Sequence, residues 1–273
     1  MYGVVTRNPE EAAWPEFDRA FHEVKSVTGR IVDPEPGTIG MIACFGDTAA
    51  GETDPSLVPV SADGTRATRE APYFDWGFVC PTDLTYRERL LDLVEETAAA
   101  TGNVRLDDIG FPRAEYCYCE RCEQAFADSE RTNRDRWRED VIETVVAAVA
   151  DRIPGDCYAT IYPDPYPGHL EQRCGVDVDR LAAHVDEFVV PLYDTAYGTT
   201  YWLETIAKGF ESRLPIGFSV ELYAVDVGID ELANATTVAS AYADHVYFGY
   251  DAGNARAVIR RHRAESRTGR RYE

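Results

Sequence analysis

Three cysteines stand within six residues of the sequence, in the segment CYCERC at positions 117–122. Thiolates at this spacing can bind a metal ion, form a redox centre or pair in disulfides. The N-terminal segment lacks the basic and long apolar regions of a signal peptide, which indicates a cytoplasmic protein. Because disulfides are rare in that compartment, the cysteine spacing favours a metal site.

A tetrahedral zinc site needs a fourth ligand besides these three cysteines. Cys80 is the first choice, because it ends an expected strand and the cluster follows the next one, so that adjacent loops would meet. Cys174 is the alternative. A site of four thiolates would be closed to water and therefore structural, with Cys80, Cys117, Cys119 and Cys122 as its ligands. An iron–sulfur cluster and ordinary reduced cysteines remain the other interpretations.

Carboxylates stand near the ends of two expected strands, as Asp107 and Asp108 in one and Glu221 in the other. Two carboxyl groups that flank a glycosidic bond can hydrolyse it, since one protonates the leaving oxygen and the other attacks or activates water. Arg105 shares a strand face with Asp107 by the period of two. If that face is the barrel interior, the arginine would hold Asp107 ionised. A purely structural acidic pair is the alternative.

Aromatic and further acidic residues collect near the same strand ends. Aromatic rings at a cleft can stack on sugar faces while their hydroxyls form hydrogen bonds, although rim packing accounts for such rings equally well. The expected substrate-binding residues are Arg105, Trp76, Tyr162, Tyr193, Asp194, Tyr223 and Asp251.

Short apolar runs alternate with helical patterns along the chain. The helical patterns are clearest at 86–102 and 134–155, and the apolar runs lie at 2–6, 39–45, 74–80, 104–111, 157–162, 187–193, 216–222 and 245–250. The alternation predicts an α/β fold, a single-domain (β/α)8 TIM barrel over 1–273 with zinc-binding loops at 80 and 117–122. An open doubly wound sheet is less favoured, because no glycine-rich phosphate loop follows an early strand.

The composition limits the partners that the protein can have. Its 273 residues carry a net charge of −21, and only Lys25 and Lys208 among the 27 basic residues are lysines. An acidic, lysine-poor surface opposes binding to nucleic acid or an anionic membrane, and resembles that of halophilic proteins. No apolar run reaches the roughly 18 residues of a membrane span. Whether the chain forms a homo-oligomer stays open.

Two segments resemble the barrel domain of family 42 glycoside hydrolases, the microbial β-galactosidases. They are CPTDLTYRERLLDLVEE at 80–96 and CYCERCEQAF at 117–126. In that family a Cys-Pro and a C-x-C-x-x-C segment bind zinc, and the four cysteines named above match these positions. LDDIGFP at 106–112 is also similar to a strand of hypothetical glycosidase-like barrels. The resemblance implies a glycosidase with a carbohydrate substrate and a structural zinc.

The resemblance also implies catalytic roles. The family has Asn-Glu where Asp107 and Asp108 stand, its Glu being the general acid/base, and a nucleophilic Glu on strand seven, where Glu221 stands. This sequence departs from the pattern with aspartate at both positions of the pair. RLD at 105–107 also resembles the Arg-x-Asp of amylase-type barrels, which would make Asp107 the nucleophile. A degenerate barrel that binds carbohydrate without cleaving it is the alternative function.

Overall fold

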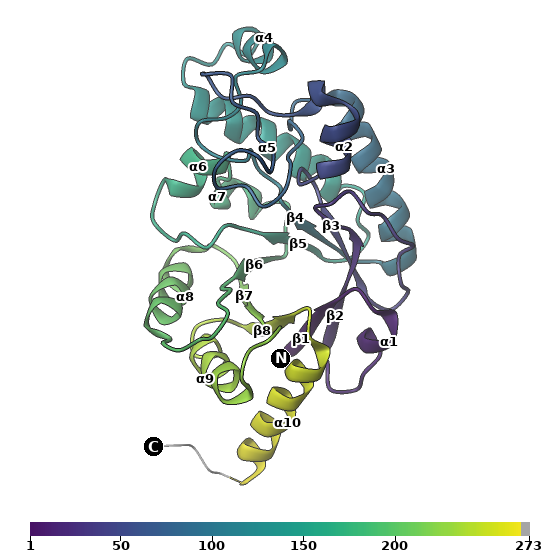
Figure 1. The fold of residues 1–273 in the computed structure, drawn as a ribbon, viewed down its shortest axis with the longest axis vertical. Coiled ribbons are helices and arrows are strands. Elements are labelled where there is room, and N and C mark those ends of the chain that lie inside the picture. The colour runs from purple at the N-terminus through teal and green to yellow at the C-terminus, as the bar shows by residue number, and fades with distance from the viewer. Residues whose placement is uncertain (269–273) are drawn as a thin grey trace.

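The structure, a computed structural model, describes residues 1–268, and the remaining residues of the predicted domain, 269–273, lie outside the described part. Within residues 1–268, eight parallel strands close into a barrel in chain order, with β8 paired to β1 (Figure 1). The predicted (β/α)8 barrel is therefore confirmed. The strands are β1 (Tyr2–Thr6), β2 (Arg19–Lys25), β3 (Ile39–Ala43), β4 (Val104–Asp107), β5 (Cys157–Thr160), β6 (Glu187–Pro191), β7 (Phe218–Tyr223) and β8 (His245–Gly249).

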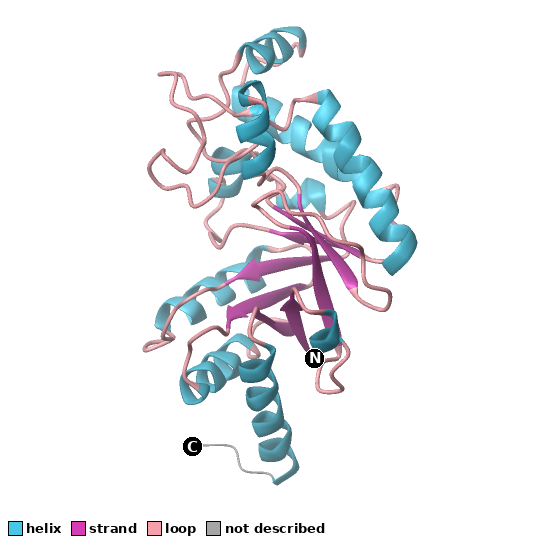
Figure 2. Cartoon of the chain, turned by 45° about the vertical axis from the view of Figure 1, so that its right-hand side comes forward, coloured by secondary structure: helices cyan, strands magenta, loops and turns pink. Residues whose placement is uncertain are grey.

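Helices surround the strands (Figure 2). They are α1 (Pro9–Ala12), α2 (Thr48–Thr53), the 3-10 helix η1 (Pro55–Leu57), α3 (Leu84–Thr101), α4 (Glu120–Asp128), α5 (Arg134–Ala150), α6 (His169–Cys174), α7 (Val178–Leu181), α8 (Tyr201–Arg213), α9 (Ile229–Ala239) and α10 (Ala252–Thr268). Side chains of Asp83 and Asn133 cap the first turns of α3 and α5, and Gly102 ends α3 with φ of 78°. None of the helices up to residue 268 combines the length and apolar character that a bilayer crossing requires.

One predicted strand was wrong and one observed strand was missed. Residues 74–80 form a loop outside the barrel sheet. An isolated antiparallel β-bridge joins Phe78 of this loop to Gly46. The missing barrel strand is β2, with the sequence RAFHEVK. Its polar side chains Glu23 and Lys25 are buried and paired inside the protein, so that no apolar alternation marks it as a strand.

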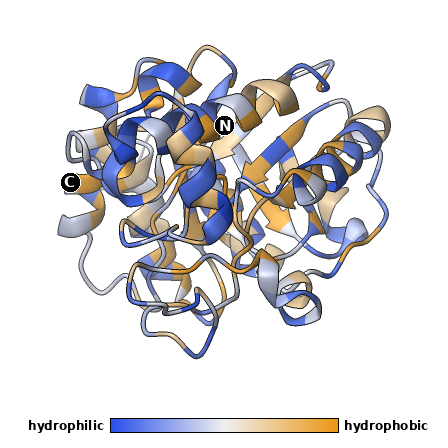
Figure 3. Ribbon diagram, turned by 90° about the horizontal axis from the view of Figure 1, so that it is seen from above, coloured by the Kyte–Doolittle hydropathy of each residue, from blue (hydrophilic) through white to orange (hydrophobic). Residues whose placement is uncertain are grey.

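The barrel interior is apolar in its middle and polar at both ends. Phe21, Met41, Val189 and other apolar side chains fill the middle, and the orange strands lie among blue and pale helices in Figure 3. At the N-terminal end, Glu187 lies 2.9 Å from Nη1 of Arg19 and accepts a 2.7 Å hydrogen bond from the Tyr247 hydroxyl. This end of a TIM barrel serves stability, whereas function is expected at the other.

The acidic composition predicts that stability depends on salt. With 48 acidic and 27 basic residues, carboxylates repel one another, and the Debye length grows to about 30 Å at 0.01 M salt. We expect the melting temperature followed by circular dichroism to fall steadily as NaCl is lowered from molar concentration. An unchanged melting temperature at about 0.01 M salt would show that the charge is not a halophilic adaptation.

Candidate functional site

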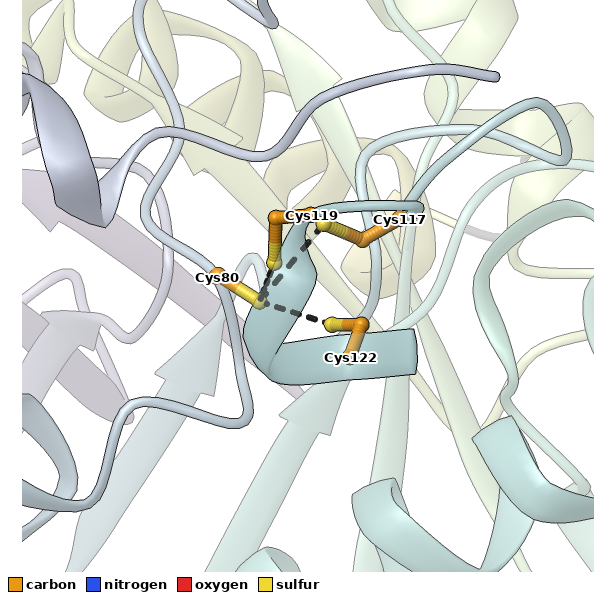
Figure 4. A group of neighbouring side chains, drawn as sticks. All are labelled: Cys80, Cys117, Cys119 and Cys122. Atoms are coloured by element: carbon orange, nitrogen blue, oxygen red, sulfur yellow. Dashed lines mark hydrogen bonds between the residues drawn. The ribbon is translucent and has the colours of Figure 1, made fainter. Parts of the chain in front are cut away.

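The four predicted cysteines come together in space. The Sγ atom of Cys80 lies 3.8 Å from that of Cys117, 3.9 Å from Cys119 and 3.2 Å from Cys122 (Figure 4). Four sulfurs around an ion with bonds of 2.3 Å would be about 3.8 Å apart in a tetrahedron. Cys119 is partly exposed, and the other three are fully buried. The donor set and its spacing therefore fit a closed metal site, and Cys174 lies outside it.

The cysteine cluster joins two long loops that are not part of the barrel wall. Cys80 lies at the end of the loop after β3, not at the end of a strand, and Cys119 is the N-cap residue of α4. The backbone N–H of Val60 donates a 3.4 Å hydrogen bond to Sγ of Cys117, and Tyr118 N–H donates to the Val60 carbonyl at 2.6 Å. The cluster thus fastens the loop after β3 to the loop after β4.

The guanidinium of Arg105 connects two of the predicted catalytic carboxylates. Its Nε lies 3.2 Å from Oδ1 of Asp107, and its Nη1 lies 2.5 Å from Oε2 of Glu221. Arg105 is 1% exposed, and its Nε also donates a 2.9 Å hydrogen bond to Thr160 Oγ1. Because β4 and β7 lie on different sides of the barrel, this contact spans the mouth. The predicted pairing of Arg105 with Asp107 is observed.

Glu221 is completely enclosed. It has 0% exposure, and the hydroxyl of Tyr193 donates a hydrogen bond to its Oε1. Burial raises the pKa of Glu221, while the charge of Arg105 opposes that rise. Tyr193 is 44% exposed, so its ring covers the carboxylate from the solvent side, and it packs against Tyr223 in a tilted arrangement with ring centroids 5.3 Å apart. A Cβ on Gly249 would lie 2.9 Å from Oε1 of Glu221, so glycine leaves the space that the carboxylate occupies.

Asp108 directly follows β4 in an unusual backbone conformation. It has a φ of 49°, in the left-handed region that non-glycine residues rarely adopt. Its Oδ2 would lie 2.7 Å from a Cβ on Gly46, so the carboxyl packs against the loop after β3. Burial raises the pKa of Asp108 to about 7, the negative charge of Asp107 adds to this, and Lys25 opposes it. Near neutral pH this carboxyl can therefore both give and take a proton.

Lys25 fixes the loop against which Asp108 lies. Its ammonium donates to the carbonyls of Ala43 and Gly46 at 2.7 and 3.0 Å, and it lies 3.1 Å from Oδ2 of Asp47. Asp47 also accepts a 2.8 Å hydrogen bond from the Tyr86 hydroxyl and caps α2. Sequence reasoning missed this role because it missed β2.

A further buried carboxylate, Glu23, was missed for the same reason. Arg7 holds it with Nε at 2.6 Å, and the Tyr250 hydroxyl lies 3.4 Å from Oε1. Burial raises the pKa of Tyr250 well above its ordinary value, and the nearby charges of Glu221 and Asp107 act in the same direction. Tyr250 thus lies between Glu23 and the carboxylates that Arg105 holds. The sequence RAFHEVK offered little signal, because Phe21 interrupts the polar residues that share its face of the strand.

The predicted aromatic residues do not form one group. Tyr193 and Tyr223 pack together near the mouth, as described above. Trp76 packs against Phe78 in the loop after β3, with ring centroids 6.0 Å apart. Tyr162 is 46% exposed, and the guanidinium of Arg173 lies 3.7 Å above its ring.

The two remaining acidic residues of the predicted binding set hold backbone groups. Asp194 accepts a 3.3 Å hydrogen bond from the N–H of Ala196, which forms a turn. Asp251 accepts a 2.9 Å hydrogen bond from the N–H of Asn254 at the start of α10. These contacts account for both carboxylates without a ligand.

Comparison with known proteins supports the fold. No protein-family model and no curated protein matches the sequence. Among solved structures, the chain is similar to alpha-L-fucosidase isoenzyme 2 from Paenibacillus thiaminolyticus, with a TM-score of 0.62, 14% identity and coverage of 97% of this chain and 49% of the fucosidase. The chain therefore spans about half of that protein. What the two share is the barrel.

Two other solved structures have lower scores. A class V chitinase from Pseudomonas fluorescens has a TM-score of 0.48 and 13% identity, with coverage of 82% of this chain and 68% of that one. The spore cortex-lytic enzyme SleL of Bacillus cereus has a TM-score of 0.48 and 11% identity, covering 82% and 50%.

Proposed function

We propose that the protein is a glycoside hydrolase-like enzyme that cleaves a glycan or glycoside with carboxyl groups at the C-terminal mouth of its barrel. The observation that carries the proposal is the buried Arg105, which holds Asp107 and Glu221 together, with Asp108 next to Asp107 in the chain at a raised pKa. Glycoside hydrolysis needs one carboxyl group that can donate a proton and a second one that is ionised, and a neighbouring cation favours the ionised form.

In this proposal Asp108 is the proton donor and Glu221 is the second carboxylate. Asp108 protonates the oxygen of the leaving group as the glycosidic bond breaks, and Glu221 attacks the anomeric carbon or takes a proton from the attacking water. Since Glu221 has no exposed surface, the sugar must displace the ring of Tyr193. Asp107, whose side chain is 19% exposed, is the competing second carboxylate.

The stereochemical outcome follows from the separation of the two carboxyl groups. Retaining enzymes hold them about 5–5.5 Å apart, and inverting enzymes about 6.5–9.5 Å apart. Aspartate at position 108 is shorter than glutamate by one methylene, about 1.5 Å. The shorter side chain favours the wider, inverting arrangement, which the anomer of the first product would reveal.

The test begins with a screen of aryl glycosides in molar NaCl, followed by Asp108→Asn. The variant should lose about 100-fold in kcat/KM near pH 6, where Asp108 is mostly protonated. Wild-type kcat/KM should fall about tenfold per pH unit above pH 7, and the variant should lack that decline. The loss should be smaller for dinitrophenyl glycosides, whose leaving groups need no protonation. Equal losses for all leaving groups would contradict the donor role.

Stability provides the control for this variant. The pKa of Asp108 is raised from 3.8 to about 7 in the folded state. Between these two pH values the folded protein keeps a proton that the unfolded chain has lost, so the free energy of unfolding falls as the pH rises through this range. Asparagine carries no charge to bury. Asp108→Asn should therefore melt at the same temperature as the wild type, or higher, at about pH 8, so unfolding cannot explain lost activity.

The complete enclosure of Glu221 favours a second candidate, a barrel that binds carbohydrate without cleaving it. This candidate would be supported if the screen detects no cleavage while a glycan binds to the protein. We also propose that the four-cysteine site holds zinc, because four thiolates in a closed tetrahedron suit that ion.

A further inference from the structure

A separate cavity of about 370 Å³ lies between the two loops that the cysteines fasten together. Its lining includes Ser61, Asp63, Tyr73, Phe74, Arg113 and Tyr118. The volume falls within the 300–1,000 Å³ typical of small-molecule sites. Because these loops follow β3 and β4, the cavity is on the same face of the barrel as Asp107 and Asp108.

Tyr73 presents a bare aromatic face at this cavity. It is 84% exposed, and its φ of 72° is strained for a residue with a side chain. The guanidinium of Arg113 lies 5.0 Å from the ring centroid and covers one face. Phe74 and the buried Tyr116, which also line the cavity, pack edge to face at 5.6 Å. An exposed ring with a guanidinium over one face is suited to stacking on a flat apolar surface.

The ionised side chains of the cavity already have partners within the protein. Nε of Arg113 lies 3.0 Å from Oε1 of Glu115. Asp63 accepts a 2.5 Å hydrogen bond from the Ser61 hydroxyl and a 3.1 Å one from the N–H of Thr65. The hydrogen bond from Ser61 lowers the pKa of Asp63, so this carboxylate stays ionised, opposes an anionic ligand and can still accept hydrogen bonds from hydroxyl groups. The lining therefore favours a neutral ligand with many hydroxyl groups and an apolar face.

The metal centre supports both walls of the cavity. Ser61 pairs with Tyr116 as an isolated bridge, next to the hydrogen bonds that Val60 makes with Tyr118 and with Sγ of Cys117. The cysteine cluster thereby keeps the two loops at a fixed separation.

We infer that this cavity binds a sugar unit of the substrate away from the bond that is cleaved. The inference rests on the proposed function and adds that the substrate is an oligosaccharide. Binding energy from a sugar unit far from the cleaved bond can contribute to catalysis when the substrate is long enough to reach the cavity. A short substrate cannot make this contact.

Tyr73→Ala tests the inference, with Tyr201→Ala as the matched control, since Tyr201 is also 79% exposed but lies on α8. The Tyr73 variant should raise KM for a trisaccharide about tenfold, as expected for a lost stacking contact. KM for the p-nitrophenyl monoglycoside of the same sugar should not change. Tyr73→Phe should behave as the wild type. Unchanged trisaccharide kinetics, or equal losses on both substrates, would overturn the inference.

If no glycoside is cleaved, the same variants are compared by titration calorimetry with maltotriose, cellotriose, xylotriose and mannotriose. Weaker binding of a trisaccharide to the Tyr73 variant than to wild type would sustain the site, although the proposed catalytic function would fail. Absence of binding of all four to the wild type would overturn the site.

Discussion

Glu221→Gln should reduce glycoside hydrolysis by roughly 10³-fold while the protein remains folded. Glutamine keeps the size of the side chain and can still contact Tyr193, but it has no negative charge with which to attack or to take a proton. Arg105 would keep Asp107 as its remaining anionic partner. The measurement is kcat on the best aryl glycoside from the screen, with the melting temperature recorded for every variant.

Glu187 offers a closely matched control at the opposite end of the barrel. It too is a buried glutamate, paired with Arg19 and hydrogen-bonded by Tyr247. Glu187→Gln should lower stability about as much as Glu221→Gln but leave kcat unchanged. Full activity in the Glu221 variant would mean that Glu221 only positions Arg105, and Asp107→Asn would then be expected to remove activity.

Loss of the metal should have the largest effect on stability. Cys122→Ser, or prolonged chelation, removes a ligand set that ties two loops together, and structural zinc binds with about 10–16 kcal/mol in small domains. Even a loss of several kcal/mol would lower the melting temperature of a chain of this size by about 10 °C or more. Turnover per folded molecule should fall less than stability does.

Metal analysis and a cysteine control complete this test. Purified protein should contain about one zinc per chain. Cys174→Ser changes a cysteine outside the cluster, whose thiol donates a 3.2 Å hydrogen bond to the Leu170 carbonyl, and this variant should keep the zinc. Protein without zinc, or with iron and visible absorbance, would refute the zinc assignment.

The barrel and the cysteine cluster could be predicted because their signals are local. The alternation of apolar runs with helical patterns predicts the barrel even with one strand misplaced, because seven of the eight predicted runs overlap observed strands. The C-x-C-x-x-C spacing fixes three ligands within one short segment, and only Cys80 had to be found at a distance.

The polar half of the site could not be predicted in the same way. β2 buries Glu23 and Lys25 by pairing them with Arg7 and with Asp47, and those partners are distant in the sequence. A buried ion pair has no hydropathy signature, so the segment resembles a surface loop. The enclosure of Glu221 depends on Tyr193, from the loop after β6, and is a property of the folded barrel alone.

The burial of Lys25 has a practical consequence for labelling. Of the two lysines in the sequence, Lys25 is 4% exposed and its ammonium is engaged by two carbonyls and a carboxylate, whereas Lys208 lies exposed on α8. Amine-directed acylation of side chains in the folded protein should therefore modify Lys208 and spare Lys25. A fluorophore or a surface tether could be attached at one defined side chain without introducing a further cysteine near the four-cysteine cluster.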